Sequence, residues 1–370
     1  MKHKVLELVQ SLDKGGRTEH IVQLSRKLTE MGNSVYTCVM QKPPTWIYEK
    51  YPEANYWKVE EKPVKFKLSY FIKLYRLVNK LQVEIIHAHC EASHLYAGLI
   101  SLLTKIPVIG TYHRPKESAY QDSWRNRVVK YLLMSHVAVA NNRKQLMVDS
   151  LKISENKISV IYNGVDIASF KKNLEDKKLL RNLLNIPEVN RVLLSLGHLG
   201  EIKGHSYTIK AFNDILKRHP DTLLYIAGSG SDEEKEELLK LTHELSLQDK
   251  IIFLGQVNNP SQWLNVCEVL LHMPLEEAFP LVILESGASK KPVIATSVGG
   301  IPEVIKHGEN GYLINVKDYR ALAELTIELL SFPDKAKEMG NVAYRIIEGR
   351  FTLEHMARQY VNLMDKLSHN

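Results

Sequence analysis

Residues 192–227 read VLLSLGHLGEIKGHSYTIKAFNDILKRHPDTLLYIA, and this stretch decides the fold. An apolar run over 192–196 predicts a buried strand, helical spacing of apolar residues follows over 205–218, and a second apolar strand is predicted over 222–227. A glycine-containing loop, Gly197 to Gly204, joins the first strand to the helix. Strand, helix and strand in this order predict a βαβ unit of a parallel sheet.

The same alternation of strands and helices extends over the rest of the chain. We expect further strands at 5–10, 34–40, 83–87, 108–111, 136–140, 251–254, 269–272, 293–295 and 312–314, with helices at 19–31, 68–81, 124–134 and 233–245. A charged segment over 171–190, which carries Pro187, interrupts the pattern and resembles a domain boundary. The sequence therefore predicts an α/β protein with two doubly wound, Rossmann-like domains at 1–170 and 171–351, followed by a terminal helix in 352–370.

The bulk composition is that of an ordinary soluble protein. The chain has 370 residues, of which 44% are hydrophobic and 25% are charged, and this length suggests two domains. No apolar run approaches the roughly 20 residues that cross a bilayer, and Glu7 and Gln10 interrupt the first apolar segment, which favours a strand over a signal peptide. The three cysteines, Cys38, Cys90 and Cys267, show no metal spacing or disulfide framework, so we expect a reducing, cytoplasmic location.

Positive charge is concentrated in the first half of the chain. The formal net charge is +7; residues 1–170 hold 25 Lys+Arg and 15 Asp+Glu, so +10, and the remainder is −3. This asymmetry suggests an anionic partner such as a membrane surface or a phosphorylated acceptor. We expect weak contact with anionic lipid headgroups through two basic clusters, one over 62–67 with Lys73, Arg76 and Lys80, the other Arg125, Arg127 and Lys130. An amphipathic helix that packs on its sheet is the alternative; no nucleic-acid motif is recognised.

The stretch from Glu276 to Glu303 contains the strongest candidate site. Glu277 lies in the loop after the predicted strand 269–272, a helix is expected to begin near Pro280, and Glu285 lies inside that helix. Free N–H groups and the positive end of the helix dipole between the two acids suit a polar or anionic ligand. A carboxylate can bind two neighbouring sugar hydroxyls with charge-assisted hydrogen bonds. Exposed surface acids are the alternative interpretation, and the spacing alone does not exclude it.

Weaker candidates follow other predicted strands. Lys203 lies after a glycine turn at a helix start, where it suits a phosphate, although a solvated loop lysine fits equally. The pair Gly15–Gly16 allows close approach of a ligand or forms a simple turn. Gly228 and Gly230 do not complete the dinucleotide pattern G-x-G-x-x-G, which disfavours a nicotinamide enzyme.

Histidines are the remaining candidates in the first half. His113 follows the strand 108–111 and could hold a sugar hydroxyl or move a proton, and His87 and His89 lie at another strand end. A satisfied polar histidine is the alternative for each. No Asp-x-Asp pair occurs in the chain, so we expect no metal in the site, and Lys203 with backbone amides would neutralise a diphosphate.

Taken together, these motifs resemble family 4 of the retaining glycosyltransferases, which have the two-domain GT-B fold. The similarity covers nearly the whole chain and includes, in order, Gly15–Gly16, 87–89, 163–166, Lys203–Gly204, 228–230 and 277–303. Its most specific part is the pair Glu277 and Glu285, with seven residues between them. Pro-Val-Ile-Ala at 292–295 and Gly-Gly-x-x-Glu at 299–303 follow this pair.

The resemblance implies two domains facing across a cleft, with the terminal helix crossing back to the first. It implies that Glu285 binds the ribose of a nucleotide, Glu277 faces the donor sugar, and Lys203 binds the diphosphate. His113 would contact the transferred sugar, and Gly16 would approach the diphosphate. The other expected donor-binding residues are Gly15, His198, Gly228, Gly230, Phe279, Pro280 and Leu281.

The implied activity is metal-independent transfer of a hexose with retention of configuration. The donor is a nucleotide-diphosphate sugar, which is a substrate, so no cofactor is expected. The acceptor would be a glycan or a lipid-linked molecule in cell-surface polysaccharide or lipopolysaccharide synthesis, with the enzyme in the cytoplasm or peripheral on the inner face of the membrane. A GT-B epimerase or hydrolase and a non-enzymatic basic binding protein are the alternatives.

Three positions depart from the family pattern. His198 stands where an arginine usually pairs with the lysine, and a neutral histidine binds phosphate more weakly. Ala278 replaces the more common glycine, which restricts the loop backbone. Residues 272–274, His-Met-Pro, stand where a Pro-Ser pair is usual.

Overall fold

The computed structural model divides the chain into two compact units, one of residues 1–164 and 353–370, the other of residues 165–352. It describes residues 2–13, 15–41, 43–50, 56–58, 66–114, 116–121, 123–171 and 177–369. Lys14 and residues 62–65 of the first basic cluster lie outside these ranges.

The boundary between the units lies earlier than the expected residue 170. The backbone N–H of Val165 donates to the carbonyl of Phe351 at 2.9 Å, and Val165 also forms an isolated bridge with Thr352. These backbone contacts bind the chain to the second unit directly after Gly164. At the other end, Leu353 begins the helix that returns to the first unit.

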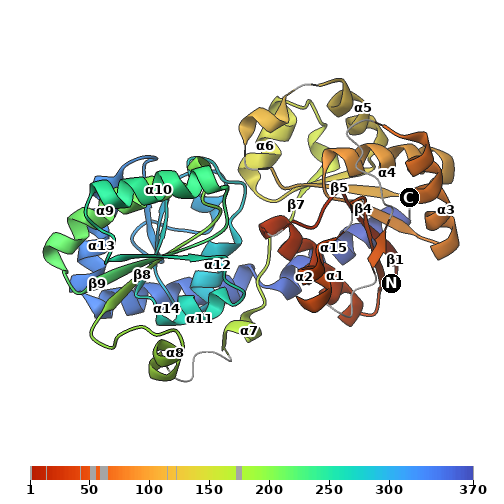
Figure 1. Cartoon of the computed structure of the whole chain (residues 1–370). Helices are drawn as coiled ribbons and strands as arrows, with labels where there is room; N and C mark the ends of the chain where they lie inside the picture. The colour runs from red at the N-terminus through yellow and green to blue at the C-terminus, as the bar shows by residue number, and fades with distance from the viewer. Residues whose placement is uncertain are drawn as a thin grey trace. The chain divides into compact units, whose positions relative to one another are not determined.

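The first unit contains a parallel sheet in the order β3-β2-β1-β4-β5-β6-β7 within its described residues (Figure 1). Apolar side chains fill most of these strands, as expected for a sheet covered on both faces. The strands are β1 (Lys4–Val9), β2 (Ser34–Val39), β3 (Tyr56–Lys58), β4 (Ile85–Ala88), β5 (Val108–Tyr112), β6 (Ser135–Ala138) and β7 (Ile158–Val160).

Alternate residues of β1 separate the two faces of this sheet. Leu6 and Leu8 pack in the cluster that includes residues of α3 (Leu68–Leu81), α4 (Glu91–Thr104) and α5 (Trp124–Leu132). Val5 packs in another cluster with α1 (Gly16–Glu30) and α15 (Leu353–Ser368). Because side chains alternate along a strand, Glu7 faces the side of α1 and α15. The shorter helices are α2 (Thr45–Lys50), α6 (Asn141–Asp149), η1 (Glu117–Tyr120) and η2 (Glu155–Lys157).

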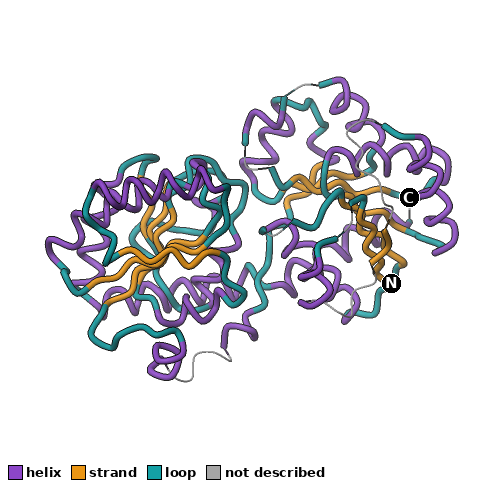
Figure 2. Tube along the Cα trace, viewed as in Figure 1, coloured by secondary structure: helices purple, strands orange, loops and turns teal. Residues whose placement is uncertain are grey.

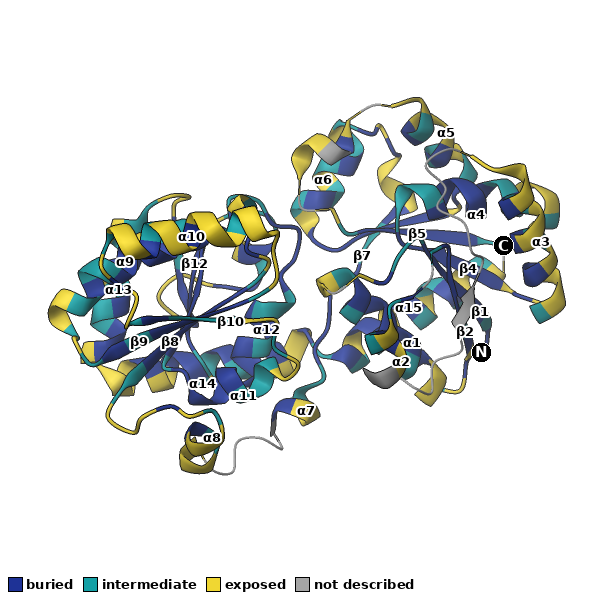
Figure 3. Ribbon diagram, in the orientation of Figure 1, coloured by how far each residue is buried: buried dark blue, intermediate teal, exposed yellow. Residues whose placement is uncertain are grey.

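The second unit contains a parallel sheet in the order β10-β9-β8-β11-β12-β13 (Figure 2). Its strands are β8 (Arg191–Leu196), β9 (Thr222–Ala227), β10 (Ile251–Gly255), β11 (Val269–His272), β12 (Val293–Thr296) and β13 (Tyr312–Ile314). The helices are α7 (Ile167–Lys171), α8 (Lys177–Leu183), η3 (Glu201–Lys203), α9 (His205–Arg218), α10 (Asp232–Glu244), α11 (Pro260–Val266), α12 (Leu281–Ala288), η4 (Ile301–Glu303), α13 (Tyr319–Ser331) and α14 (Pro333–Arg350). Its strands are mostly buried between helical layers (Figure 3).

Both sheets have the doubly wound form that the sequence predicts, and the terminal helix belongs to the first unit as expected. Because every strand pair is parallel, the loops after the strands lie at one edge of each sheet. No helix in the described part of the chain combines the length and apolarity needed to cross a bilayer.

Candidate functional site

Lys203 and Glu277 meet at the carboxyl edge of the second sheet. Lys203 ends the short helix η3 after β8, and Glu277 lies in the loop after the neighbouring strand β11. Gly204 has φ +68°, and a Cβ there would collide with the carbonyl oxygen of Met273. The absence of that atom lets the two loops lie against each other, which brings the two charged side chains together.

A buried ion pair results. Nζ of Lys203 donates to Oε2 of Glu277 at 2.5 Å, and the backbone N–H of Ala278 donates to Oε1 at 3.0 Å. Nε2 of His272 lies 3.7 Å from Oε2. Burial acts to raise the pKa of Glu277, but Lys203 and His272 together lower that pKa to about 2. The carboxylate is therefore ionised at neutral pH.

The loop after β12 fixes Glu277 from the other side. Gly299 has φ +58°, and a Cβ there would collide with the carbonyl oxygen of Glu277. The N–H of Gly300 donates to the carbonyl of Ala278 at 2.8 Å. Any larger residue at 299 must displace the Glu277 loop. The alanine at 278, where the family usually has glycine, is buried and fits this loop.

Helix α12 follows this loop and carries the second acid. It begins at Leu281 with Pro280 as its N-cap, in agreement with the expected start near Pro280. Phe279 is buried, with its ring 5.7 Å from that of Phe351. Glu285 lies half-buried one turn into the helix. The first turn of α12 thus separates Glu277 from Glu285, and the N–H groups of a first helical turn have no partner within the helix.

The remaining expected residues lie in the loops after β8 and β9. His198 is largely exposed, and its Nδ1 accepts from the N–H of Gly200 at 3.0 Å. Gly228 packs so closely on the Gly197 carbonyl that a Cβ would collide with it, and Gly230 lies against Leu199. His198 therefore lies in the same loop after β8 that leads to Lys203.

A separate cavity of about 590 Å³ lies in the first unit. The expected residues Gly15, Gly16 and His113 all line it, and so do cationic groups from Arg17, Arg114 and Arg125. Arg114 pairs with Glu91 at 2.7 Å. Asp13 and Glu91 line the cavity as well, and Asp13 lies 4.0 Å from Arg17, so the surplus is one positive side chain.

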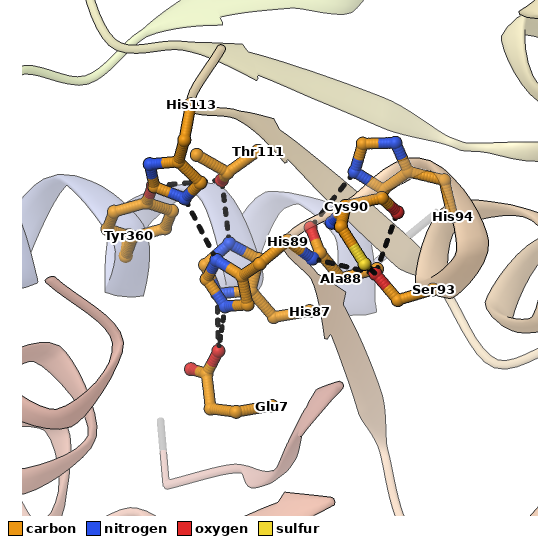
Figure 4. A network of polar contacts seen from close by, with 10 residues as sticks. All are labelled: Glu7, His87, Ala88, His89, Cys90, Ser93, His94, Thr111, His113 and Tyr360. Carbon is orange, nitrogen blue, oxygen red and sulfur yellow. Dashed lines mark hydrogen bonds and ion pairs between the residues drawn. The ribbon is translucent and has the colours of Figure 1, made fainter. Parts of the chain in front are cut away.

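A chain of buried polar side chains lies beneath His113 (Figure 4). His89 Nδ1 lies 3.1 Å from Nε2 of His113, and His89 Nε2 lies 2.5 Å from Oε2 of Glu7. If the Glu7 carboxylate accepts, His89 must donate from Nε2 and accept at Nδ1 from the Nε2–H of His113. That tautomer leaves Nδ1 of His113 as a hydrogen-bond acceptor.

The same carboxylate connects to the terminal helix. His87 Nδ1 lies 3.0 Å from Oε2 of Glu7, and His87 Nε2 lies 2.7 Å from Oγ1 of Thr111. That hydroxyl lies 3.0 Å from the Tyr360 hydroxyl of α15 (Figure 4). The terminal helix therefore helps to fix the histidines behind the cavity.

His20, His89 and His113 are neutral at physiological pH. Burial, together with neighbouring histidines, lowers the pKa values of His89 and His113 well below 6.5. Burial also lowers the pKa of His20 to about 4, and its Nδ1 lies 2.9 Å from the Asn163 side chain. These three histidines can therefore relay a proton, but they do not act as cations near pH 7.

Sequence reasoning missed Glu7, His20 and Tyr360. The available signal for Glu7 was a single acid inside an otherwise apolar strand, since such a residue is almost never buried without a partner. His20 and Tyr360 gave no comparable signal, because both occupy ordinary positions on amphipathic helices.

Comparison with known proteins identifies the family. The model for "Glycosyltransferase Family 4" matches residues 14–169, and that for "Glycosyl transferases group 1" matches residues 176–346. Together the two models cover most of the chain. The chain belongs to the family 4 glycosyltransferases, has the GT-B fold and is a glycosyltransferase.

Individual relatives are distant but extend over most of the chain. N-acetyl-alpha-D-glucosaminyl L-malate synthase of Bacillus anthracis is 26% identical over 351 residues, covering 91% of this chain and 90% of the relative. The Escherichia coli UDP-Gal:alpha-D-GlcNAc-diphosphoundecaprenol alpha-1,3-galactosyltransferase is 26% identical over 259 residues, with coverage of 67% and 66%. Anabaena HepE, solved in complex with UDP-glucose, has a TM-score of 0.86 at 20% identity, with coverage of 98% and 100%.

Proposed function

We propose that this glycosyltransferase is a retaining, metal-independent hexosyltransferase that uses a nucleotide-diphosphate sugar. The observation that carries the proposal is the buried Lys203–Glu277 pair beside the first turn of α12. An ammonium, an ionised carboxylate and the N-terminus of a helix together suit a molecule with both a diphosphate and a sugar. The solved complex of HepE with UDP-glucose supports the same class of donor.

Each residue of the second unit has a proposed role. Lys203 binds the diphosphate, with His198 as a weaker neighbour, and Glu277 accepts hydrogen bonds from sugar hydroxyls. Glu285 binds the ribose, one helix turn away. The N–H groups of Phe279 and Leu281 assist at the phosphate and sugar, whereas Pro280 has no N–H to offer. Gly228 and Gly230 let the neighbouring loops approach the donor.

Transfer then requires little covalent participation by the protein. The acceptor hydroxyl attacks the anomeric carbon on the face that the diphosphate leaves, and the departing phosphate oxygen takes the hydroxyl proton. Lys203 and the helix N–H groups stabilise the charge that develops on that oxygen. In the first unit, we assign substrate-binding roles to Gly15, Gly16 and His113, which line its cavity, with His113 accepting a hydrogen bond at Nδ1. The absence of an Asp-x-Asp pair supports a mechanism without a metal.

The proposed acceptor is a glycan or a lipid-linked molecule in cell-surface polysaccharide or lipopolysaccharide synthesis. The surplus of cations around the first-unit cavity suits an acceptor that carries phosphate. The E. coli relative acts on a diphosphoundecaprenol-linked sugar according to its name, which supports a lipid-linked acceptor. A cytoplasmic enzyme, peripheral on the inner face of the membrane, fits such a substrate.

Release of nucleoside diphosphate from a panel of UDP-, GDP- and ADP-sugars tests the proposal. The wild type should turn over at least one donor, and Lys203→Ala and Glu277→Ala should abolish that turnover. Lys240→Ala is the matched control, because Lys240 is an exposed lysine of α10 in the same unit. Wild-type turnover in both site variants would contradict the assignment. Anomeric inversion in the product, or isomerisation of the donor sugar without transfer, would refute the retaining transferase in favour of another reaction.

A further inference from the structure

Helix α5 turns an aromatic and apolar face to solvent. Trp124, Val128 and Tyr131 follow the i, i+4, i+7 spacing of one helix face, and their exposed fractions are 64%, 39% and 75%. The opposite face, with Val129, packs in the core. Exposed aromatic residues on one helix stripe are unusual in a protein without a partner for that face.

The neighbouring helix extends this surface. Leu102 and Leu103, in the last turn of α4, are both exposed. The two helices pack closely, since a Cβ at Gly98 of α4 would collide with the Leu132 side chain of α5. Figure 3 shows exposed residues on α5 beside α4. We call the set Leu102, Leu103, Trp124, Val128 and Tyr131 the α4–α5 surface.

Cations border the α4–α5 surface. The Arg125 guanidinium lies 5.5 Å from the centre of the Trp124 ring, and the Lys130 ammonium lies 5.1 Å from that of Tyr131. Lys105 and Arg127 are exposed on the same two-helix segment. The sequence contains no Asp or Glu from 92 to 116 or from 123 to 148. The cations that border the α4–α5 surface are therefore not neutralised by any acid within residues 92–116 or 123–148.

From this geometry, we propose that the α4–α5 surface docks on an anionic lipid bilayer. Tryptophan and tyrosine favour the boundary between headgroups and acyl chains, and flanking lysines and arginines bind anionic headgroups. A second copy of the chain fits less well, because a two-fold interface would place these like-charged borders against each other. An anionic membrane satisfies both the apolar centre and the cationic border.

The structure also separates the two basic clusters that the sequence predicts. Helix α3 buries its apolar stripe, which includes Tyr70, Leu74 and Val78, in the core. It leaves Lys73 and Arg76 exposed, together with the aliphatic residues Leu68 and Ile72. Helix α5 differs because its outward face carries tryptophan and tyrosine, the residues that favour the headgroup boundary, so we assign the docking surface to α5.

The position of α5 connects docking to the cavity. Its residues Arg125 and Asn126 line the first-unit cavity, while Trp124 and Tyr131 face solvent. A bilayer bound at the α4–α5 surface therefore lies next to the cavity from which a lipid-linked acceptor would be used. This connection rests on the proposed function, whereas lipid binding itself does not.

Co-sedimentation with vesicles tests the docking surface. The protein should bind phosphatidylcholine–phosphatidylglycerol vesicles at low salt and release at high salt, with weak binding to pure phosphatidylcholine. The R127A/K130A variant should bind roughly 30-fold more weakly, since each cation near such a surface contributes about 1 kcal/mol. W124A/Y131A should lose most binding, whereas K73A/R76A on α3 should bind like the wild type. The Trp124 fluorescence should shift to shorter wavelength on binding, and W124F should lack this component.

Three results would overturn the inference. The first is that the wild type does not bind anionic vesicles at low salt. The second is that K73A/R76A and R127A/K130A weaken vesicle binding equally, and the third is that the wild type self-associates through Trp124 and Tyr131, as shown by its loss in W124A/Y131A, without binding vesicles. Donor turnover in solution keeps this test separate from the proposed function. W124A/Y131A should retain that turnover, and a wild type that binds vesicles but turns over no donor would refute the proposed function alone.

Discussion

Replacement of Glu277 by glutamine removes the negative charge of the ion pair and one of its two acceptor oxygens. In the wild type Oε2 accepts from Lys203 and Oε1 accepts from Ala278, so the single amide oxygen can keep only one of these two hydrogen bonds. The Lys203 ammonium loses its counter-charge while its side chain is only 22% exposed. Breaking a buried pair usually costs about 3–5 kcal/mol. Because one of the two hydrogen bonds is kept and Lys203 is partly solvated, we expect about 2 kcal/mol.

Thermal and urea unfolding of Glu277→Gln measure this cost. For a unit of this size, about 2 kcal/mol corresponds to a Tm lower by roughly 4–8 °C. Lys203→Met in the Glu277→Gln background should recover most of the loss, because it removes the ammonium left without its counter-charge. The pKa of Glu277 is about 2 in the folded protein, below its usual 4.5. The stabilisation is therefore complete above pH 4.5 and lost as the pH falls through about 2.

Catalysis should fall as well. A hydrogen bond from a sugar hydroxyl to a charged group contributes about 1.5–3 kcal/mol, so kcat/KM for the donor should drop by roughly 10- to 150-fold in Glu277→Gln. An unchanged Tm between pH 5 and 8, or a loss that Lys203→Met does not relieve, would refute the description of the pair. Unchanged kcat/KM would refute its contact with the sugar.

Four further predictions follow from the site. Glu7→Gln should lower turnover by about tenfold, because the fixed tautomer of His89 is lost. The double variant Glu7→Gln/His113→Asn should lose no more turnover than His113→Asn alone, whereas additive losses would show that the two residues act independently. Sugar transfer should persist in excess EDTA, whereas loss restored by a divalent cation would contradict the metal-independent mechanism. His198→Arg should increase the affinity for nucleoside diphosphate, measured by calorimetry, by about tenfold, because a guanidinium binds phosphate with charge-assisted hydrogen bonds. An unchanged affinity would show that residue 198 does not contact the diphosphate. The buried histidines of the first unit, such as His94 with a pKa of about 3, bind protons more readily in the unfolded chain than in the folded protein. Below pH 6.5 each such histidine should therefore lower the stability of this unit by about 1.4 kcal/mol per pH unit. Urea midpoints that stay constant from pH 6.5 to 4.5 would contradict the burial of these histidines.

The sequence predicts much of the fold because hydrophobic periodicity is local information. Helices α3 and α9 and strands β9, β11 and β13 begin and end where the pattern places them. The sequence places the domain boundary at residue 170, whereas the first unit ends at Gly164. Backbone contacts of Val165 with Phe351 and Thr352 determine this boundary, and contacts between residues so far apart in sequence produce no local sequence pattern. Helix α12 begins at Leu281, next to the proline that predicts a helix start there.

The candidate site was predictable in part for the same reason. The resemblance selects Glu277 and Lys203 as residues after strands, but their ion pair depends on how closely Gly204 and Gly299 let three loops pack. The chain from Glu7 through His89 to His113 joins three strands of the sheet, and only the strand order brings them together. The outward face of α5 could not be predicted either, because a helix with apolar residues on two sides shows no preference for which side is buried.

Calorimetric titration of nucleoside diphosphates and nucleotide sugars into the wild type and Lys203→Ala tests the central claim most directly. The account predicts that at least one of UDP, GDP or ADP binds the wild type, that the matching nucleotide sugar binds too, and that Lys203→Ala weakens both while Lys240→Ala weakens neither. Failure of every nucleotide to bind the wild type, or binding that Lys203→Ala leaves unchanged, would contradict the assignment of the donor site to the second unit.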